Sequence, residues 1–321
     1  MKILITGGLG YAGSVLSKYL SKQNNIYIID KVLFNNSQYK KIKNKNITLH
    51  KFDILNSNKV EKIFKSNNID LVIHLAAIVG DPASKAQPEL TKQINLIASK
   101  KVFSLAKKYS VKKFIFFSTC SNYGLSYYKK LLKETSPLKP LSMYAKTKVD
   151  FEKFLLKDKS KIKKIILRLS TLYGLSFRMR FDLTVNEFLK KMYFKEKLDV
   201  YYKDTFRPYL SLDDLKIIVE KLINYKFRKN SIVFNVGFNK ENLSKKSIVE
   251  KVSKQLSFKS KYNYIDREHF DRRNYRVDFS KIKKIGIKQK FNFNYNIKKM
   301  LSYLKKATKK ATNKKIFYNH R

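Results

Sequence analysis

A short apolar run near the start of the chain breaks into glycines and then reopens as a helix-forming segment. Residues 3–6 read Ile-Leu-Ile-Thr, and Gly7, Gly10 and Gly13 follow at regular spacing. A sharp turn whose amide groups approach an anion at the start of a helix needs residues without a Cβ. The spacing is one residue longer than in the Gly-x-Gly-x-x-Gly fingerprint. The pattern therefore predicts either a dinucleotide-binding turn or an ordinary strand-to-helix turn of an α/β protein.

The segment after these glycines favours the dinucleotide-binding turn. A helix is predicted over residues 11–23, followed by an apolar strand over 26–29 that ends in Asp30. A carboxylate at this strand end is placed to accept hydrogen bonds from the adenosine ribose hydroxyls and would repel a 2′-phosphate. We therefore predict NAD as the cofactor, not NADP. The cation of Lys31, directly beside Asp30, would partly neutralise that repulsion.

Strands and helices alternate through the first half of the chain. Further strands are predicted at residues 47–52, 71–77 and 114–117, and helices at 57–67 and 86–109. This order is typical of an α/β fold with a doubly wound parallel sheet. Ligands bind beyond the carboxyl ends of such strands, where the sequence places Asp53, Ile54, Ala76, Ala77, Ser118 and Thr119.

Two polar residues near these strand ends have more than one interpretation. Asp53 either hydrogen-bonds the adenine amine or caps the next helix, and the sequence leaves both open. His74 ends a buried strand, and we interpret it as a packed histidine that does not contact ligand. Ala76 and Ala77 are small enough for the backbone to approach the cofactor.

Tyr144 and Lys148 stand four residues apart at a predicted helix start that Ser142 would cap. On one helix face, the ammonium would lower the pKa of the phenol from its usual value of about 10. Such a phenolate takes a proton from a substrate hydroxyl while the adjacent carbon gives its hydride to a nicotinamide. Thr119 would supply a hydroxyl that orients the substrate oxygen. Combined with the glycine turn, these residues predict NAD-dependent chemistry at a hydroxyl.

The formal net charge of +47 invites a nucleic-acid interpretation. The lysines, however, run through the whole chain instead of clustering, so we expect no specific nucleic-acid partner. Arginines are rare, and the first is Arg168. Where a chain otherwise uses lysine, a guanidinium suggests two-pronged binding of phosphate or carboxylate, so several arginines are expected to face an anion.

Other features of composition limit the location of the protein. The single cysteine, Cys120, rules out a disulfide within the chain and fits a reducing cytoplasm. The first predicted strand begins at Lys2, so no leader is expected, and no apolar run is long enough to span a membrane. No metal-ligand set is predicted.

Taken together, these motifs resemble the extended short-chain dehydrogenase/reductase family, the NAD-dependent nucleotide-sugar epimerases and dehydratases. The matching stretches span nearly the whole chain: Thr6-Gly7-Gly8-Leu9-Gly10-Tyr11-Ala12-Gly13, Asp53-Ile54, His74-Leu75-Ala76-Ala77, Ser118-Thr119 with Tyr123-Gly124, Tyr144-x-x-x-Lys148, Arg207-Pro208-Tyr209 through Asp214, and Asn235-Val236-Gly237.

The resemblance implies a set of site residues. Thr119, Tyr144 and Lys148 would be catalytic, with Lys148 also binding the nicotinamide ribose. Cofactor contacts would come from Gly7, Gly10, Tyr11, Ala12, Gly13, Asp30, Lys31, Asp53, Ile54, Leu75, Ala76, Ala77 and Asn95. Substrate contacts would come from Thr171, Arg178, Asn186, Arg207, Arg272 and Arg273.

The resemblance also implies an interleaved architecture and a homodimer. Residues 1–173 would form a Rossmann-type NAD-binding domain, to which 203–237 return. Residues 174–202 and 238–308 would form a smaller C-terminal lobe that binds the nucleotide sugar against that domain. The lysine-rich end, 309–321, is expected to be a solvated basic tail.

The residues after Thr119 indicate the reaction. Dehydratases of this family carry an Asp-Glu pair there to expel the C6 hydroxyl, whereas this chain has Cys120-Ser121 as small, weakly polar walls. The main prediction is therefore a nucleotide-sugar epimerase that oxidises C4 by hydride transfer to NAD.

Two alternatives stay open at this point. A nucleotide-sugar 4-dehydrogenase or reductase is one, because Thr171 replaces the Asn of typical galactose epimerases and residues 176–183 resemble a subgroup that oxidises GDP-heptoses. A non-catalytic dinucleotide- or RNA-binding relative is the other, on the evidence of the charge and of the lysine-rich stretch from Lys305 to Arg321. The sequence does not name the sugar or the nucleotide.

Overall fold

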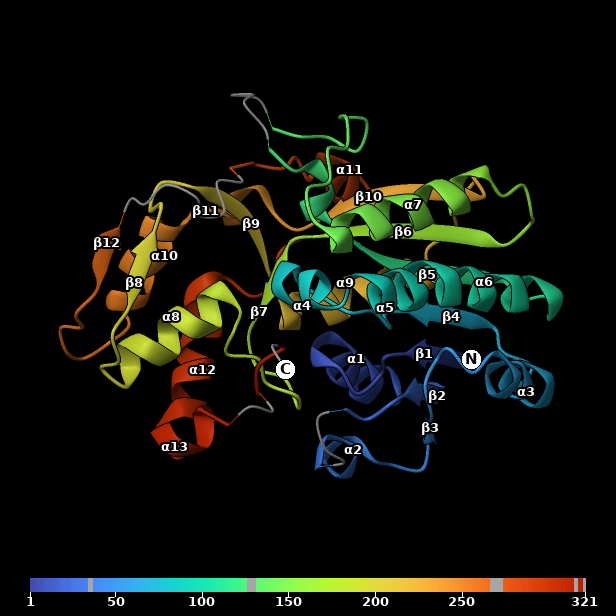
Figure 1. Ribbon diagram of the computed structural model, residues 1–321, viewed down its shortest axis with the longest axis horizontal. Helices are drawn as coiled ribbons and strands as arrows, with labels where there is room; N and C mark the ends of the chain where they lie inside the picture. Colours follow the sequence, from blue (N-terminus) through green and yellow to red (C-terminus); the bar gives the residue numbers. More distant parts are fainter. Residues whose placement is uncertain (34–36, 126–130, 266–273, 315–316, 320–321) are drawn as a thin grey trace.

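The computed structural model describes the chain except residues 34–36, 126–130, 266–273, 315–316 and 320–321 (Figure 1). Arg272 and Arg273, two predicted substrate contacts, lie outside the described residues.

Seven parallel strands form the central sheet in the order β10-β6-β5-β4-β1-β2-β3. They are β1 (Lys2–Thr6), β2 (Asn25–Asp30), β3 (Ile47–Lys51), β4 (Leu71–His74), β5 (Lys113–Thr119), β6 (Lys163–Leu169) and β10 (Ser231–Val236). The chain leaves β1 toward β2 and β3 and then crosses to β4, so the strand order reverses beside β1. This is the Rossmann arrangement, and it confirms the predicted doubly wound parallel sheet.

The strand register brings the candidate residues level with one another. Thr6 pairs with Ile29 of β2 and with His74 of β4. The residues that follow these three strands therefore leave the sheet side by side, at the point where the strand order reverses. Such a switch point is where ligands of open α/β sheets bind.

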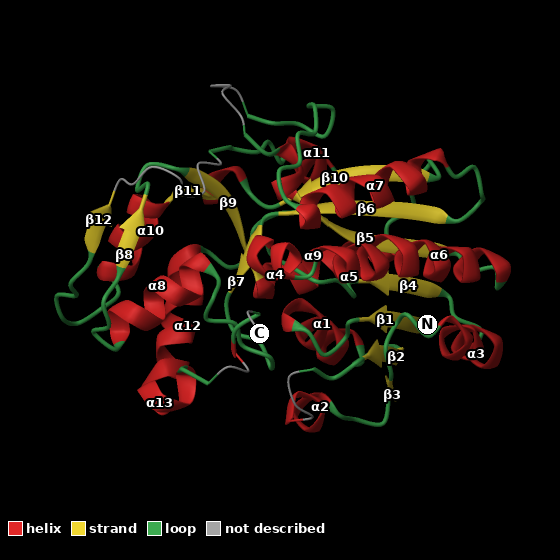
Figure 2. Cartoon of the chain, viewed as in Figure 1, coloured by secondary structure: helices red, strands yellow, loops and turns green. Residues whose placement is uncertain are grey.

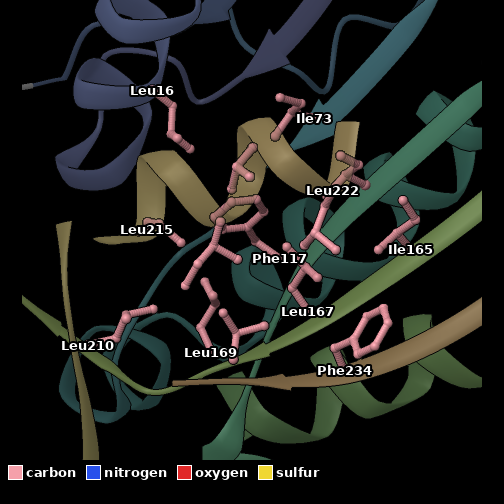
Figure 3. Close-up of a cluster of buried hydrophobic side chains, with 14 of the residues drawn as sticks. Leu16, Ile73, Phe117, Ile165, Leu167, Leu169, Leu210, Leu215, Leu222 and Phe234 are labelled. Atoms are coloured by element: carbon pink, nitrogen blue, oxygen red, sulfur yellow. The ribbon is translucent and has the colours of Figure 1, made fainter. Parts of the chain in front are cut away.

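Both faces of the sheet are buried, which explains why its strands are almost continuously apolar. On β1, Ile3 and Ile5 belong to one core and Leu4 to the other. The first core is covered by α1 (Tyr11–Leu20), α2 (Ser37–Ile42) and α9 (Leu212–Asn224). Figure 3 shows Leu215 and Leu222 of α9 meeting side chains of β4, β5 and β6 in this core. The second core is covered by α3 (Ser57–Asn67), α6 (Ser99–Lys108) and α7 (Met143–Lys157).

The helix predicted over 86–109 is divided. It consists of α5 (Pro88–Lys92), the π-helix η1 (Gln93–Ala98) and α6, preceded by the separate α4 (Asp81–Ala86). A break falls at Gln87, because Pro88 has no N–H to continue a helix from α4. The 3-10 helix η2 (Cys120–Tyr123) follows β5 directly.

A smaller lobe lies beside the sheet domain (Figure 2). Its strands are β7 (Thr171–Tyr173), β9 (Phe206–Ser211) and β11 (Asn242–Ser244) in one sheet, and β8 (Asp199–Tyr201) with β12 (Asn263–Ile265) in another. Its helices are α8 (Thr184–Tyr193), η3 (Asn239–Glu241), α10 (Lys245–Ser253), α12 (Phe293–Lys306) and α13 (Lys309–Thr312). A separate apolar core that includes Phe181, Leu189, Ile248 and Ile297 holds the lobe together.

Several segments pack differently from the expectation. The expected division puts β7 and β9 in the NAD-binding domain, but they pair in a separate sheet with β11. Val277, Phe279 and Ile282, around α11 (Ser280–Lys284), belong to the core of the main sheet, although the predicted division places them in the lobe. Within the expected solvated tail, the backbone O of Phe317 accepts a hydrogen bond from Phe181 at 3.0 Å. The prediction of a solvated tail is therefore wrong for Phe317. Among the described residues, no helix is both long and apolar enough to cross a membrane.

Candidate active site

The turn between β1 and α1 leaves no room for a side chain at two of its three predicted glycines. Gly7 has a φ of +70°, and a Cβ on it would lie 2.9 Å from the backbone N of Ala76, two residues beyond the end of β4. A Cβ on Gly13 would lie 2.2 Å from the carbonyl O of Gly7, whereas a Cβ on Gly10 would find its nearest neighbour at 3.2 Å. Gly8, which the spacing does not single out, is also crowded, because its Cβ would lie 2.7 Å from Cγ2 of Ile28.

The start of α1 is open to an anion. Gly10 occupies the N-cap, and among the described residues no side chain caps this helix or adds a carboxylate to its first turn. The first N–H groups of a helix have no intrahelical partner and carry the positive end of its dipole. A pyrophosphate therefore fits here, and the bare glycine backbone lets it approach.

A cavity of about 280 Å³ lies at this edge of the sheet. Its lining includes the predicted cofactor contacts Gly7, Gly10, Tyr11, Ala12, Gly13, Asp30, Lys31, Asp53, Ile54, Leu75, Ala76 and Ala77. Tyr144, Lys148 and Arg178 line it as well. The described lining does not include the other predicted contacts Asn95, Thr119, Thr171, Asn186 and Arg207.

The Asp30 carboxylate stands at the end of β2, where the sequence places it. It accepts hydrogen bonds from the backbone N–H groups of Leu9, at 2.9 Å, and Val32, at 2.8 Å. Burial raises the pKa of Asp30, although these bonds and the charge of Arg178 oppose the rise. The two backbone bonds fix the carboxylate against the glycine turn.

Lys31 forms an ion pair with Asp53 and not with Asp30. Its Nζ pairs with the carboxylate of Asp53 at 2.9 Å, so the expected neutralisation of Asp30 is not what the geometry provides. Of the two interpretations of Asp53, capping is excluded, because the side chain of Asn56 caps α3. Asp53 instead accepts a hydrogen bond from the N–H of Leu55 at 3.0 Å and lines the cavity.

The three predicted catalytic residues come together. Ser142 caps α7 by accepting a hydrogen bond from the N–H of Ala145 at 3.2 Å, as expected. The hydroxyl of Thr119 lies near enough to the phenol of Tyr144 to act on its pKa, which it lowers. Lys148 Nζ lies 5.8 Å from the centre of the Tyr144 ring. A phenol, an ammonium and a hydroxyl therefore meet at the end of β5.

The electrostatics of this group differ from the expectation. Burial raises the pKa of Tyr144 to about 12 and lowers the pKa of Lys148 to about 7. Lys148 Nζ donates to the carbonyl of Phe117 at 2.9 Å. The prediction that Lys148 lowers the pKa of the phenol is therefore wrong for the protein alone: burial raises this pKa, and the opposing influences come from Thr119 and Arg180.

Two predicted ligand contacts, Asn186 and Asn95, form hydrogen bonds with the protein backbone instead. Asn186 accepts a hydrogen bond from the N–H of Gly174 at 3.1 Å and donates to the Tyr11 hydroxyl at 2.9 Å. Asn95 accepts from the N–H of Ile78 at 2.8 Å and donates to its carbonyl at 3.0 Å. Both amides are committed to the protein, so they support the walls of the cavity and do not line it.

The predicted substrate contacts separate in space. Thr171 lies on β7 and Arg207 on β9, where the guanidinium stacks 5.0 Å from the ring centre of Tyr275. Arg178 lines the cavity, and its charge acts on Asp30 and Tyr11. Arg178 thus lines the same cavity as the residues predicted to contact the cofactor.

Other polar groups behave as structural residues. His74 shares hydrogen bonds with the hydroxyls of Thr6 and Ser99, each at 2.8 Å, and burial lowers its pKa to about 3. This confirms a packed histidine. Cys120 is buried against the carbonyl of Arg168 and is not among the described cavity-lining residues, so the expectation that it forms a wall is wrong. No cluster of His, Cys, Asp or Glu within the described ranges could hold a metal ion.

Sequence reasoning missed several residues of the cavity. Ile78, Val79 and Arg180 line it, and so does Asn319 from the end of the chain. Arg180 is held by a two-pronged pair with Asp182, Nη2 lying 2.6 Å from Oδ2. No sequence signal marks Asn319, which stands in a lysine-rich stretch with the composition of a solvated tail.

Comparison with known proteins agrees with this geometry. Residues 3–237 match the model of the NAD dependent epimerase/dehydratase family. A dTDP-D-glucose 4,6-dehydratase of Dictyostelium discoideum is 26% identical over 95% of this chain and 81% of its own length. A UDP-glucuronate 4-epimerase of Thermodesulfobacterium geofontis is 27% identical over 88% of this chain and 89% of its own.

Solved structures of 4-epimerases share the fold of this chain. The UDP-glucose 4-epimerase of Thermotoga maritima, with UDP-glucose, has a TM-score of 0.86 and 25% identity, over 95% of this chain and 99% of that one. The UDP-glucuronic acid 4-epimerase of Bacillus cereus, with UDP-glucuronic acid and NAD, has a TM-score of 0.84 and 25% identity over the same shares. Since the family model covers well over half of the sequence, the chain belongs to the NAD-dependent epimerase/dehydratase family.

Proposed function

We propose that this chain is an NAD-dependent nucleotide-sugar 4-epimerase. The observation that carries the proposal is that Tyr144 and Lys148 line the same cavity as the glycine turn and Asp30. The open start of α1 fits a pyrophosphate, and the carboxylate at the end of β2 fits a ribose diol. When bound, NAD would supply the acceptor and donor of hydride for C4 of the sugar.

The side chains of the chain itself would handle the proton. Once Tyr144 has lost its own proton, its phenolate oxygen would accept the proton of the C4 hydroxyl and later return it to the ketone oxygen. Thr119, whose hydroxyl acts on the pKa of that phenol, would orient the substrate oxygen. Lys148 adds positive charge beside the phenol when it is protonated. An epimerase further requires that the 4-keto sugar turn, so that hydride returns to the opposite face.

Dehydration is a weaker candidate, although a dehydratase is among the relatives. Expelling the C6 hydroxyl needs an acid after Thr119. The residue there is Cys120, whose pKa is raised by burial and whose thiol donates to the carbonyl of Arg168 at 3.2 Å. This environment holds the thiol away from acid–base chemistry in the cavity.

The substrate class follows from the relatives. UDP-glucose and UDP-glucuronic acid are bound in the two structures described above, so UDP-sugars are the first substrates to test. The homodimer, the cytoplasmic location and the absence of a specific nucleic-acid partner stay predictions of the sequence.

A substrate panel tests the proposal. The purified protein is incubated with NAD and with UDP-, GDP-, CDP- and dTDP-sugars, and the products are identified by NMR. We expect a sugar nucleotide inverted at C4 without net NADH. Accumulating NADH would instead identify a dehydrogenase. Tyr144→Phe should abolish turnover and leave NAD affinity nearly unchanged, and turnover that survives this change would contradict the role of Tyr144.

A further inference from the structure

The end of the chain reaches the cavity and connects its two sides. Asn319 lines the cavity. Its Oδ1 accepts a hydrogen bond from Nη2 of Arg178 at 2.8 Å, and its backbone N–H donates to Asp182 at 3.2 Å. Its Nδ2 donates to the carbonyl of Val79 at 3.4 Å. Val79 follows β4 of the main sheet, whereas Arg178 and Asp182 belong to the segment that leads into the lobe.

This contact is held by a docked segment, residues 317–319. The ring of Phe317 packs edge-on against Phe181 at 5.6 Å, in addition to the backbone bond between the two residues. The hydroxyl of Tyr318 accepts a hydrogen bond from the buried Lys190 at 3.1 Å. In Figure 1 the red end of the chain runs from α13 back toward α1. The segment is thus anchored on the lobe before it reaches the cavity.

Arg178, the partner of Asn319, is tied to the start of α1. The hydroxyl of Ser176 donates to the carbonyl of Tyr11 at 2.7 Å and accepts from the N–H of Arg178 at 3.1 Å. The Tyr11 hydroxyl donates to the carbonyl of Gly174 at 2.7 Å. A guanidinium in the same cavity as an open helix start is suited to bind phosphate oxygens in two-pronged fashion.

We propose that Asn319 is a positioning residue that holds the Arg178 guanidinium for the pyrophosphate of the dinucleotide. The inference rests on the proposed function, because it assumes that NAD occupies the cavity. Asn319 contacts Arg178 through an acceptor oxygen, which orients the guanidinium without cancelling its charge.

Binding measurements test this role without any sugar substrate. NAD affinity is measured by calorimetry and NAD dissociation by stopped-flow for the full chain, Asn319→Ala, Asn319→Asp and the exposed lobe variant Asn294→Ala. Asn319→Ala removes the oxygen that accepts the hydrogen bond from Arg178. It should weaken NAD binding about tenfold and speed NAD dissociation by a similar factor. Asn319→Asp should weaken it at least as much, because its carboxylate competes with the pyrophosphate for Arg178. Asn294→Ala should match the wild type.

Adenosine, which has no phosphate, separates positioning from general loss of structure. Its affinity should be the same in the wild type and all three variants. The role of Asn319 would be overturned if Asn319→Ala lost affinity equally for adenosine and NAD, or if it released NAD at the wild-type rate. Neither result would bear on the proposed function. A wild-type protein that binds no NAD would instead overturn the proposed function.

Discussion

The guanidinium of Arg168 donates hydrogen bonds to the carboxylate of Glu152, which lies one turn of α7 beyond Lys148. Nη2 lies 2.8 Å and Nε 3.1 Å from Oε2. The same carboxylate accepts hydrogen bonds from the hydroxyl of Ser118 and from the amide of Asn122. This buried network joins α7 to the end of β5 and thereby fixes the two elements that carry Tyr144 and Thr119.

Removing the charge of Glu152 should destabilise the fold. In Glu152→Gln, Arg168 stays buried without a counter-charge, which costs about 3 kcal/mol or more of unfolding free energy. Urea denaturation measures the change. The control is Glu187→Gln, which breaks the more exposed pair with Lys191 and should change stability by less than about 1 kcal/mol. Equal effects of the two substitutions would contradict a structural role for the buried pair.

The glycine turn should be sensitive to single methyl groups in a defined order. Gly13→Ala places a Cβ 2.2 Å from the carbonyl of Gly7, so the backbone must shift where the pyrophosphate would lie. Overpacking of this kind costs roughly 1–3 kcal/mol, and calorimetry should show NAD binding about tenfold weaker or more. Gly10→Ala, with its nearest neighbour at 3.2 Å, should have a smaller effect. The reverse order would show that the turn is not the phosphate site.

Asp30 should set the preference for NAD over NADP. Asp30→Asn keeps an oxygen for the ribose and removes the charge that repels a 2′-phosphate, so NADP affinity should rise about tenfold relative to NAD. Lys31→Ala should leave the preference unchanged, because Lys31 pairs with Asp53. Competition binding against both dinucleotides measures the ratio. A large effect of Lys31→Ala would mean that its ammonium faces the ribose in solution.

Local pattern predicted the parts of the site that depend on strand ends and helix spacing. The glycine turn, Asp30 and the Tyr144–Lys148 pair all follow from the position of a residue within its own element. Asn186 and Asn319 depend instead on distant partners, Tyr11 and Val79, from which 175 and 240 residues separate them. An amide can bind ligand or hold backbone, and only the folded chain decides between them.

Burial is the second property that spacing does not reveal. A spacing of four residues correctly placed Tyr144 and Lys148 on one helix face. It gave no measure of the water that each group loses, and this loss raises the pKa of the phenol and lowers the pKa of the amine. The same residue pair on an exposed helix would show the opposite change in the phenol.

Lys148 should lower the stability of the folded protein at neutral and acidic pH. Its pKa is about 7 in the folded state, against about 10.5 when solvated. Between these values the unfolded chain holds a proton that the folded chain has lost, so stability rises with pH across this window. Below about pH 7 Lys148 is protonated in both states, and the folded state carries the full free-energy cost of a buried ammonium. Lys148→Met should therefore stabilise the fold by a few kcal/mol at about pH 6, with the gain vanishing near pH 10.

Urea denaturation of Lys148→Met at several pH values measures this change. The matched control is Lys146→Met, on the same helix but exposed, which should shift stability by at most about 0.5 kcal/mol at any pH. The Lys148 variant should also lose turnover, since the charge beside Tyr144 disappears. A stabilised but inactive protein would mean that the buried amine is kept for catalysis at the expense of the fold, whereas a gain that does not depend on pH would contradict a depressed pKa for Lys148.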